Sequence, residues 1–248
     1  LMLDAGVGHQ IDDPLSFDHS GPSFVNILKG TDTPKRVAFS PDLSLVSMEK
    51  EIAEICGATT TVFADIGAEV TDEIPDFTGV LQAFQTLRAV LFATMMEPIL
   101  KQHRDKIAPE IIGNIECGLN IMPSQIFEAE RVRIELFKKI LAFFETHDFL
   151  ICPAASIAPF SVDQRYVTEI DGKPCETYID WFSITFALTM TGCPTISVPC
   201  GFTSEGLPVS IQIMGKPRGE AALLLVAKQF EQAIGIAAQL PIAPRKGI

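Results

Sequence analysis

The chain has 248 residues, of which 47% are hydrophobic and 20% charged, and this composition is that of a globular domain rather than a disordered segment. Its net charge of −12 argues against direct nucleic-acid binding, and the densest basic group, within residues 131–139, alternates with glutamates as on a solvated helix face. No apolar run reaches the roughly 20 residues that cross a bilayer, and no signal peptide is recognisable, so we expect no membrane association.

The first residues are typical of the end of an apolar helix that has no cap before it. Leu1 to Gly6 (LMLDAG) is followed by a loop rich in turn formers over residues 8–20. Helices normally begin at a capping residue, so this start predicts that the sequence is a piece of a longer protein.

A strand–helix–strand unit is predicted next. Residues 35–40 (KRVAFS) have the apolar weight of a short buried strand, and Ser47 is placed to cap a helix over residues 48–66. Residues 68–70 then form a second strand. This order predicts two parallel strands joined by a crossover helix.

Two long helices and another strand follow. Residues 82–96 are strongly apolar and predict a helix that breaks at Pro98. Pro123 suits the first position of a helix over residues 123–145, whose apolar residues recur at three- and four-residue steps. Residues 149–152 (FLIC) predict a buried strand that ends at Pro153.

The last third of the chain is predicted to return to strands. Asp171-Gly172 suits the turn of a small hairpin, and residues 178–191 predict a helix closed by Gly192. Two β-type runs follow at residues 195–198 and 208–214, with a helix over residues 220–234 capped by Gly235. Strands separated by helices indicate an α/β layered fold with a mixed sheet.

Candidate catalytic groups are few. The sequence holds no GxSxG elbow, no SxxK and no serine- and glycine-rich run that would place a hydroxyl over backbone amides. His19-Ser20 lies among turn formers and predicts a loop role. His103 and His147 fall near predicted helix ends, where surface histidines are expected.

The cysteines indicate thiols rather than a framework. They form no CxxC pair and no cluster at metal-ligand spacing, so we expect free thiols in a reducing cytoplasm, with no metal and no cofactor. Cys193 and Cys200 in particular are expected to be structural, because neither has a predicted histidine nearby. The full set is Cys56, Cys117, Cys152, Cys175, Cys193 and Cys200.

Several motifs resemble the carboxyl-terminal half of the amidase signature family. The most specific is residues 191–215, TGCPTISVPCGFTSEGLPVSIQIMG. Further similarity, in the family's order, lies in residues 1–16, in RVAFSPD (36–42), in FLICP (149–153), in Asp180-Trp181 and in residues 223–231.

This resemblance implies a layered α/β/α fold in which residues 1–248 form the carboxyl-terminal portion of a single amidase domain. Complete members hydrolyse a carboxylic amide to an acid plus ammonia or an amine, with a Ser–cis-Ser–Lys triad in the first half of the fold. No residue of this chain therefore inherits a catalytic role. The resemblance assigns a substrate-pocket role to Cys152, Pro153, Trp181, Thr191, Gly192 and Cys193.

Three functional interpretations stay open. The first is the non-nucleophile half of a bacterial-type amidase, whose partners are a small-molecule amide and a missing amino-terminal half or another chain. The second is a part of the related subunit of a glutamyl/aspartyl-tRNA amidotransferase. The third is a non-catalytic binding or scaffold protein. Half of a layered sheet leaves an unpaired edge and an uncovered apolar face, so the chain alone is expected to form a homo-oligomer or bind a hydrophobic dye.

Overall fold

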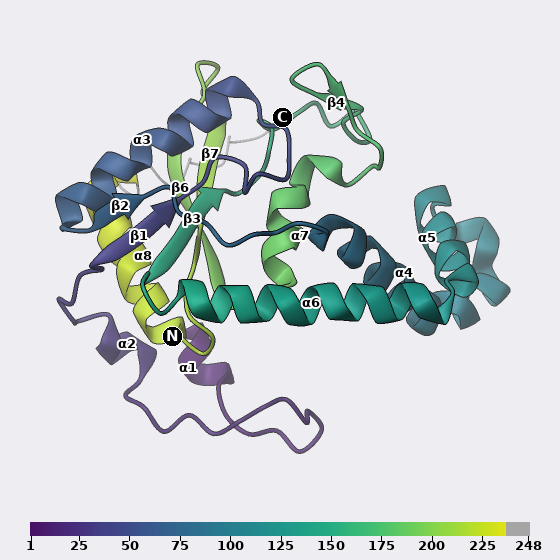
Figure 1. Ribbon diagram of the computed structural model, residues 1–248, viewed down its shortest axis with the longest axis horizontal. Helices are drawn as coiled ribbons and strands as arrows, with labels where there is room; N and C mark the ends of the chain where they lie inside the picture. The colour runs from purple at the N-terminus through teal and green to yellow at the C-terminus, as the bar shows by residue number, and fades with distance from the viewer. Residues whose placement is uncertain (237–248) are drawn as a thin grey trace, which may run out of the picture.

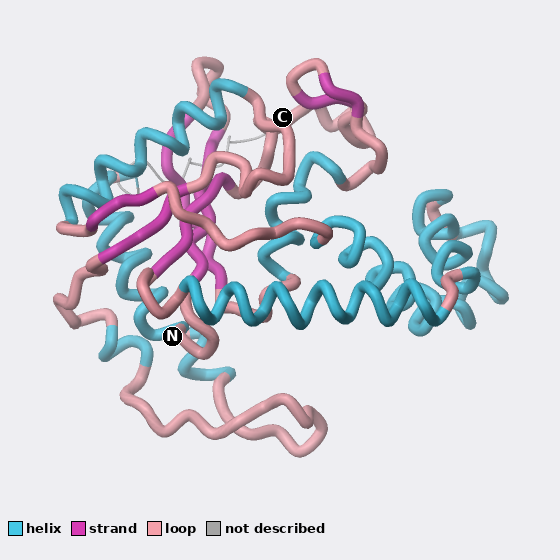
Figure 2. The backbone as a smooth tube through the Cα atoms, viewed as in Figure 1, coloured by secondary structure: helices cyan, strands magenta, loops and turns pink. Residues whose placement is uncertain are grey.

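The computed structural model describes residues 1–236 and places five strands in one mixed sheet, in the order β2-β1-β3-β7-β6 (Figures 1 and 2). β2, β1 and β3 are parallel, whereas β7 is antiparallel to both β3 and β6. The strands are β1 Arg36–Phe39, β2 Glu69–Thr71, β3 Phe149–Pro153, β6 Thr195–Phe202 and β7 Pro208–Met214. The predicted α/β fold with a mixed sheet is confirmed.

Helices cover both faces of this sheet (Figure 2). They are α1 Met2–Gly6, α2 Phe24–Ile27, α3 Lys50–Ile66, α4 Val80–His103, α5 Pro109–Asn120, α6 Pro123–Phe143, α7 Ser183–Thr189 and α8 Glu220–Ile234, with 3-10 turns at Arg104–Lys106 and Asp180–Phe182. A separate hairpin joins β4 Glu169–Ile170 to β5 Lys173–Pro174. Among residues 1–236, no helix is long and apolar enough to cross a membrane.

The predicted crossover unit is present as β1-α3-β2. Gly67 ends α3 with a φ of 108°, which a glycine adopts without strain, and its N–H bonds the Ala64 carbonyl at 2.9 Å. The chain then returns to pair β2 beside β1 in parallel.

One face of the sheet packs on α3 and α8. Phe63 of α3 and Phe230 of α8 stack with ring centroids 5.1 Å apart, and both side chains are fully buried. Strand β6 approaches α3 so closely that a Cβ at Gly201 would lie 2.7 Å from Ile55 Cγ2. A glycine at this position therefore lets helix and strand pack in direct contact.

The other face packs on α4, α6 and α7. Leu136 and Ile140 of α6 are buried against the sheet residues Leu150 and Cys152. Figure 1 shows α6 running from the sheet to α5, which lies at the far end of the molecule from β2. α5 packs on α4, so these two helices extend the layer beyond the sheet.

Two predicted helix starts are wrong for local reasons. α3 begins at Lys50, and Ser47 does not cap it. Glu49 stands at the N-cap position, and its carboxylate instead accepts a hydrogen bond from the Ala158 N–H at 2.9 Å. The stretch 178–182 is not α-helical, because Asp180 Oδ2 accepts the N–H groups of Glu176 and Thr177 in a turn, at 2.7 and 2.9 Å.

The predicted break at Pro98 is also wrong. α4 continues through Pro98 to His103, and Leu100 beyond it is buried. Packing against α5 explains this, because Gly118 lets the two helices meet at backbone distance near Ala89. α5 itself has no counterpart among the predicted helices, whereas α8 and its Gly235 cap lie where the sequence predicts them.

Candidate functional site

The loop that leaves β3 is held rigidly on both sides. The Glu49 N–H donates to the Ser156 carbonyl at 2.9 Å, while the Glu49 carboxylate accepts from the Ala158 N–H. The Ser156 N–H donates to the Trp181 carbonyl at 3.1 Å. Residues 154–160 are therefore fixed between the start of α3 and the turn that precedes α7.

A cavity of about 450 Å³, called here the β3 pocket, opens between this loop and the β6–β7 hairpin. The Trp181 ring meets Phe160 edge to face, with centroids 5.5 Å apart. Small polar side chains, Ser197 and Ser210, line the side formed by β6 and β7. The remaining lining is apolar: Ile52, Ala154, Ala155, Ile157, Ala158, Pro159, Pro208 and Val209.

A second hollow of about 800 Å³, called here the helical groove, lies between α4, α6 and the end of α7. It is lined by Phe84, Leu87, Arg88, Leu91, Arg133, Ile134, Phe137, Lys138, Thr189, Met190, Thr191 and Gly192. Arg88 bonds Asn114 Oδ1 at 2.8 Å and the Tyr178 hydroxyl, which ties α4 to α5 and to the chain before α7.

Two of the predicted pocket residues are packed inside the sheet. Cys152 is fully buried, and burial raises the pKa of its thiol to about 12. Gln212 of β7 donates to the Pro153 carbonyl at 3.0 Å and lies 3.7 Å from the Cys152 sulfur. Neither residue lines the β3 pocket or the helical groove.

The other predicted pocket residues fall into two places. Trp181 lines the β3 pocket, whereas Thr191 and Gly192 line the helical groove. Thr191 Oγ1 donates to the Leu188 carbonyl at 2.6 Å and accepts from the Cys193 N–H at 3.1 Å, so it shapes the turn after α7. Cys193 is half-buried, and burial raises the pKa of its thiol. The structure thus does not bring the six residues to one cavity.

No activated nucleophile is found within residues 1–236. His9 Nδ1 lies 3.5 Å from Ser16 Oγ, which is beyond the usual reach of a general base. Ser16 Oγ instead donates within its own exposed loop, to the Asp13 carbonyl at 2.6 Å. His19 bonds the Pro22 carbonyl at 3.1 Å and fits the predicted loop role.

The thiols within the described residues are all free and offer no reactive thiolate. The Cys56 and Cys200 sulfurs lie 3.9 Å apart in the core between α3 and the sheet. Hydrogen bonding to Cys200, together with burial, holds the pKa of the Cys56 thiol far above its usual range. Among residues 1–236, no group of three His, Cys, Asp or Glu side chains converges as a metal site would require.

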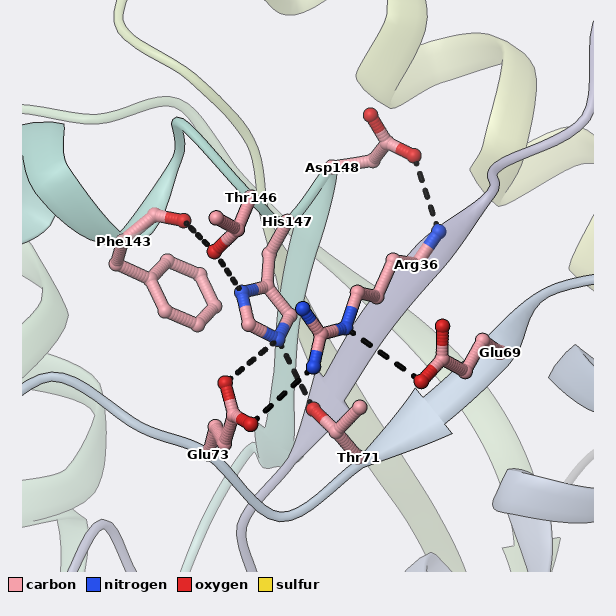
Figure 3. A network of polar contacts seen from close by, with 8 residues as sticks. All are labelled: Arg36, Glu69, Thr71, Glu73, Phe143, Thr146, His147 and Asp148. Atoms are coloured by element: carbon pink, nitrogen blue, oxygen red, sulfur yellow. Dashed lines mark hydrogen bonds and ion pairs between the residues drawn. The ribbon is translucent and has the colours of Figure 1, made fainter.

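A polar network lies where β1, β2 and β3 meet the loops that flank them (Figure 3). His147, predicted to be a surface residue, is 2% exposed, stacks on Phe143 and bonds Thr71 Oγ1 at 3.0 Å. Glu73 lies 3.8 Å from His147 and 3.2 Å from Arg36. The histidine is buried because it packs between α6 and β2, so the network ties strands together and faces no cavity among those described above.

These features belong to a known class of protein. A family model described as Amidase matches residues 1–224, and the chain therefore belongs to the amidase family. The fold and the motifs resembling the amidase signature enzymes agree with this assignment.

Among curated proteins, the chain is similar to an acylamidase of Rhodococcus erythropolis, with 27% identity over 93% of this chain and 49% of that protein. It is also similar to a glutamyl-tRNA(Gln) amidotransferase subunit of Roseobacter denitrificans, with 25% identity over 96% of this chain and 53% of that protein. The chain thus spans about half the length of the curated relatives it matches.

Solved structures confirm the fold. A bacterial aryl acylamidase of the amidase signature family superposes with a TM-score of 0.80 at 23% identity, over 95% of this chain and 52% of that protein. The 6-aminohexanoate cyclic dimer hydrolase superposes with a TM-score of 0.79 at 19% identity, over 94% of this chain and 52% of that protein.

Proposed function

We propose that this chain supplies the part of an amidase that walls the substrate pocket, while residues outside this sequence supply the nucleophile. The complete enzyme hydrolyses a carboxylic amide to an acid and ammonia or an amine. The observation that carries the proposal is the β3 pocket, which is shaped for an apolar group although residues 1–236 provide no activated nucleophile beside it.

Amide hydrolysis needs a nucleophile, a base and donors for the oxyanion. This chain contributes binding surface instead. Trp181, Phe160 and Ile157 present an apolar wall, and Ser197 and Ser210 offer small polar groups on the opposite side. An amide with an aromatic or branched apolar acyl group suits this arrangement, because the wall excludes water around the group while the serines permit a polar end.

The first test uses the chain alone. Purified protein is incubated with acyl anilides and primary amides, and amine or ammonia release is measured. We expect no turnover and no labelling by a serine-directed fluorophosphonate. Turnover that this reagent abolishes would refute the proposal, because it would require a nucleophile among these residues.

The second test restores the rest of the fold. The part of the Rhodococcus acylamidase that this chain does not match is fused to it, and anilide hydrolysis is measured. Activity is expected to return, and Trp181→Ala is expected to raise KM for an aromatic acyl group by roughly tenfold, from the loss of about 1.4 kcal/mol of contact. Val162→Ala is the matched control, because Val162 is 97% exposed in the same region. Equal KM values for the two variants would remove Trp181 from the pocket.

A role within a tRNA-dependent amidotransferase is a second candidate, favoured by relatives such as those of Roseobacter denitrificans and Alkaliphilus metalliredigens, both 25% identical to this chain. In this role the ammonia released would serve a partner protein instead of leaving as product. The net charge of −12 places any RNA contact on that partner. Glutaminase activity of the fused enzyme without anilide hydrolysis would favour this candidate, and an inactive fusion would favour a binding or scaffold role.

A further inference from the structure

The helical groove is an open apolar surface. Leu91, Ile134 and Phe137 line it and are 55%, 53% and 40% exposed. The charges at its rim are already paired, Arg133 with Glu130 at 2.6 Å and Lys138 with Glu135 at 2.7 Å. Exposed apolar side chains gathered in one hollow are typical of an interaction surface rather than of a solvated helix pair.

The free edge of β6 continues this surface. Within the described residues, β6 pairs with β7 alone. The Gly215 N–H donates to the Pro194 carbonyl at 3.0 Å. Because hydrogen-bonded pairs alternate along an antiparallel ladder, the backbone groups of Thr195 and Ser197 point away from β7. Both side chains are exposed as well, whereas Val198 is buried.

The groove and the edge are joined through the chain. Residues 189–192 line one end of the groove, and β6 begins at Thr195. We propose that these two surfaces, together called the docking face, bind the complementary half of the amidase fold, with a strand added to β6 and an apolar segment seated in the groove. This proposal rests on the proposed function, because it names the surface through which the two parts of that enzyme meet.

Two observations favour this occupant over a second copy. The relatives that match this chain are about twice as long, since the match covers 49% of the Rhodococcus acylamidase and 52% of the aryl acylamidase structure. The remaining half of such a protein must pack against the matched half. A second copy, in contrast, would bring two chains of net charge −12 together, and their repulsion opposes association.

The experiment measures binding rather than turnover. The unmatched part of the Rhodococcus acylamidase is expressed as a separate tagged polypeptide and immobilised, and this chain is passed over it. Ile134→Asp with Phe137→Asp is expected to weaken binding at least about tenfold, because two carboxylates would be buried unpaired. Phe127→Asp is the matched control on the same helix, 58% exposed and outside the groove, and is expected to leave Kd within about twofold of the unchanged chain.

The β6 edge is tested by the same assay. Ser197→Pro removes an outward-facing N–H and is expected to weaken binding by about tenfold, since a proline cannot donate to an added strand. Hydrogen exchange of the unchanged chain gives a second measurement that needs no variant. The N–H groups of Thr195 and Ser197 are expected to become protected when the probe is bound.

Three results would overturn the proposal: no binding of the probe, binding that the groove variant and the exchange data leave unaffected, or self-association through the groove that the aspartates abolish. Turnover of the reconstituted pair is recorded separately. Binding through the docking face without turnover would refute the proposed function alone, and turnover that is insensitive to the groove variant would refute the docking face alone.

Discussion

Gly118 sets the distance between α4 and α5, and replacing it should separate them. A Cβ at this position would lie 2.0 Å from the Ala89 carbonyl oxygen and 2.8 Å from Ala93 Cβ. The nearest atom belongs to the backbone of α4, so no side-chain rotation can relieve the clash. Gly118→Ala therefore requires α5 to move away from α4 as a body.

The size of the effect follows from two opposing terms. Alanine gains about 1 kcal/mol over glycine in helix propensity. Ordinary non-bonded contacts need about 3.5 Å, so the helices must part by over ~1 Å, and forced overpacking costs about 1–3 kcal/mol, occasionally more. A backbone clash as close as this one belongs at or above the upper end of that range. We expect a net loss of about 2 kcal/mol in the free energy of unfolding.

Gly113 provides the matched control on the same helix. It is exposed, and a Cβ there would meet nothing within 4 Å. Gly113→Ala is therefore expected to stabilise the protein by about 0.5–1 kcal/mol. Urea unfolding followed by far-UV circular dichroism measures both changes. Equal shifts for the two variants, or a stabilised Gly118→Ala, would refute the close packing of α4 on α5.

Three further predictions concern buried groups. Ser156→Ala should raise the free energy of unfolding by about 1 kcal/mol, because Ser156 Oγ is buried without a partner in the described chain; a loss measured by urea unfolding would contradict this. His147→Ala should lower it by about 2–3 kcal/mol through lost stacking and the lost bond to Thr71, and an unchanged midpoint would argue against the network. Iodoacetamide at mildly alkaline pH should label Cys117 quickly and Cys152 only after unfolding, because the first is exposed and burial raises the pKa of the second to about 12; peptide mass spectrometry that finds Cys152 labelled in the folded protein would contradict this.

Local signals explain the parts of the fold that the sequence predicted well. The β6–β7 hairpin is bounded by glycine and proline residues whose turn preferences act within a few positions, and Gly235 caps α8 in the left-handed conformation, at a φ of 70°. These interactions need no knowledge of distant residues. Their boundaries agree to within a few residues, although β6 extends past a bulge between Pro199 and Gly201.

Tertiary contacts explain the failures. Pro98 stays within α4 although proline usually ends a helix, because α5 packs alongside. His147 is buried because β2 is brought against the end of α6, which no local pattern around the histidine reveals.

The site was predicted in part. Trp181 lies at a cavity as expected, but Cys152 does not, because the register of β3 against β7 places Gln212 beside it. That pairing joins residues far apart in the sequence and leaves no local pattern. The small apolar residues after β3, which line the β3 pocket with Phe160, are the sequence signal that could have located this cavity.

The mixed sheet has a consequence for the rate and order of folding. Pairing β6 with β7 closes only residues 203–207, whereas pairing β1 with β3 must first enclose residues 40–148. From the logarithmic dependence of loop-closure entropy on length, the second closure costs roughly 3 kcal/mol more. We therefore expect the hairpin to form early and the parallel pairs to form late. The central strand β3 is then the last to find both neighbours, and its apolar residues stay exposed to aggregation until it does.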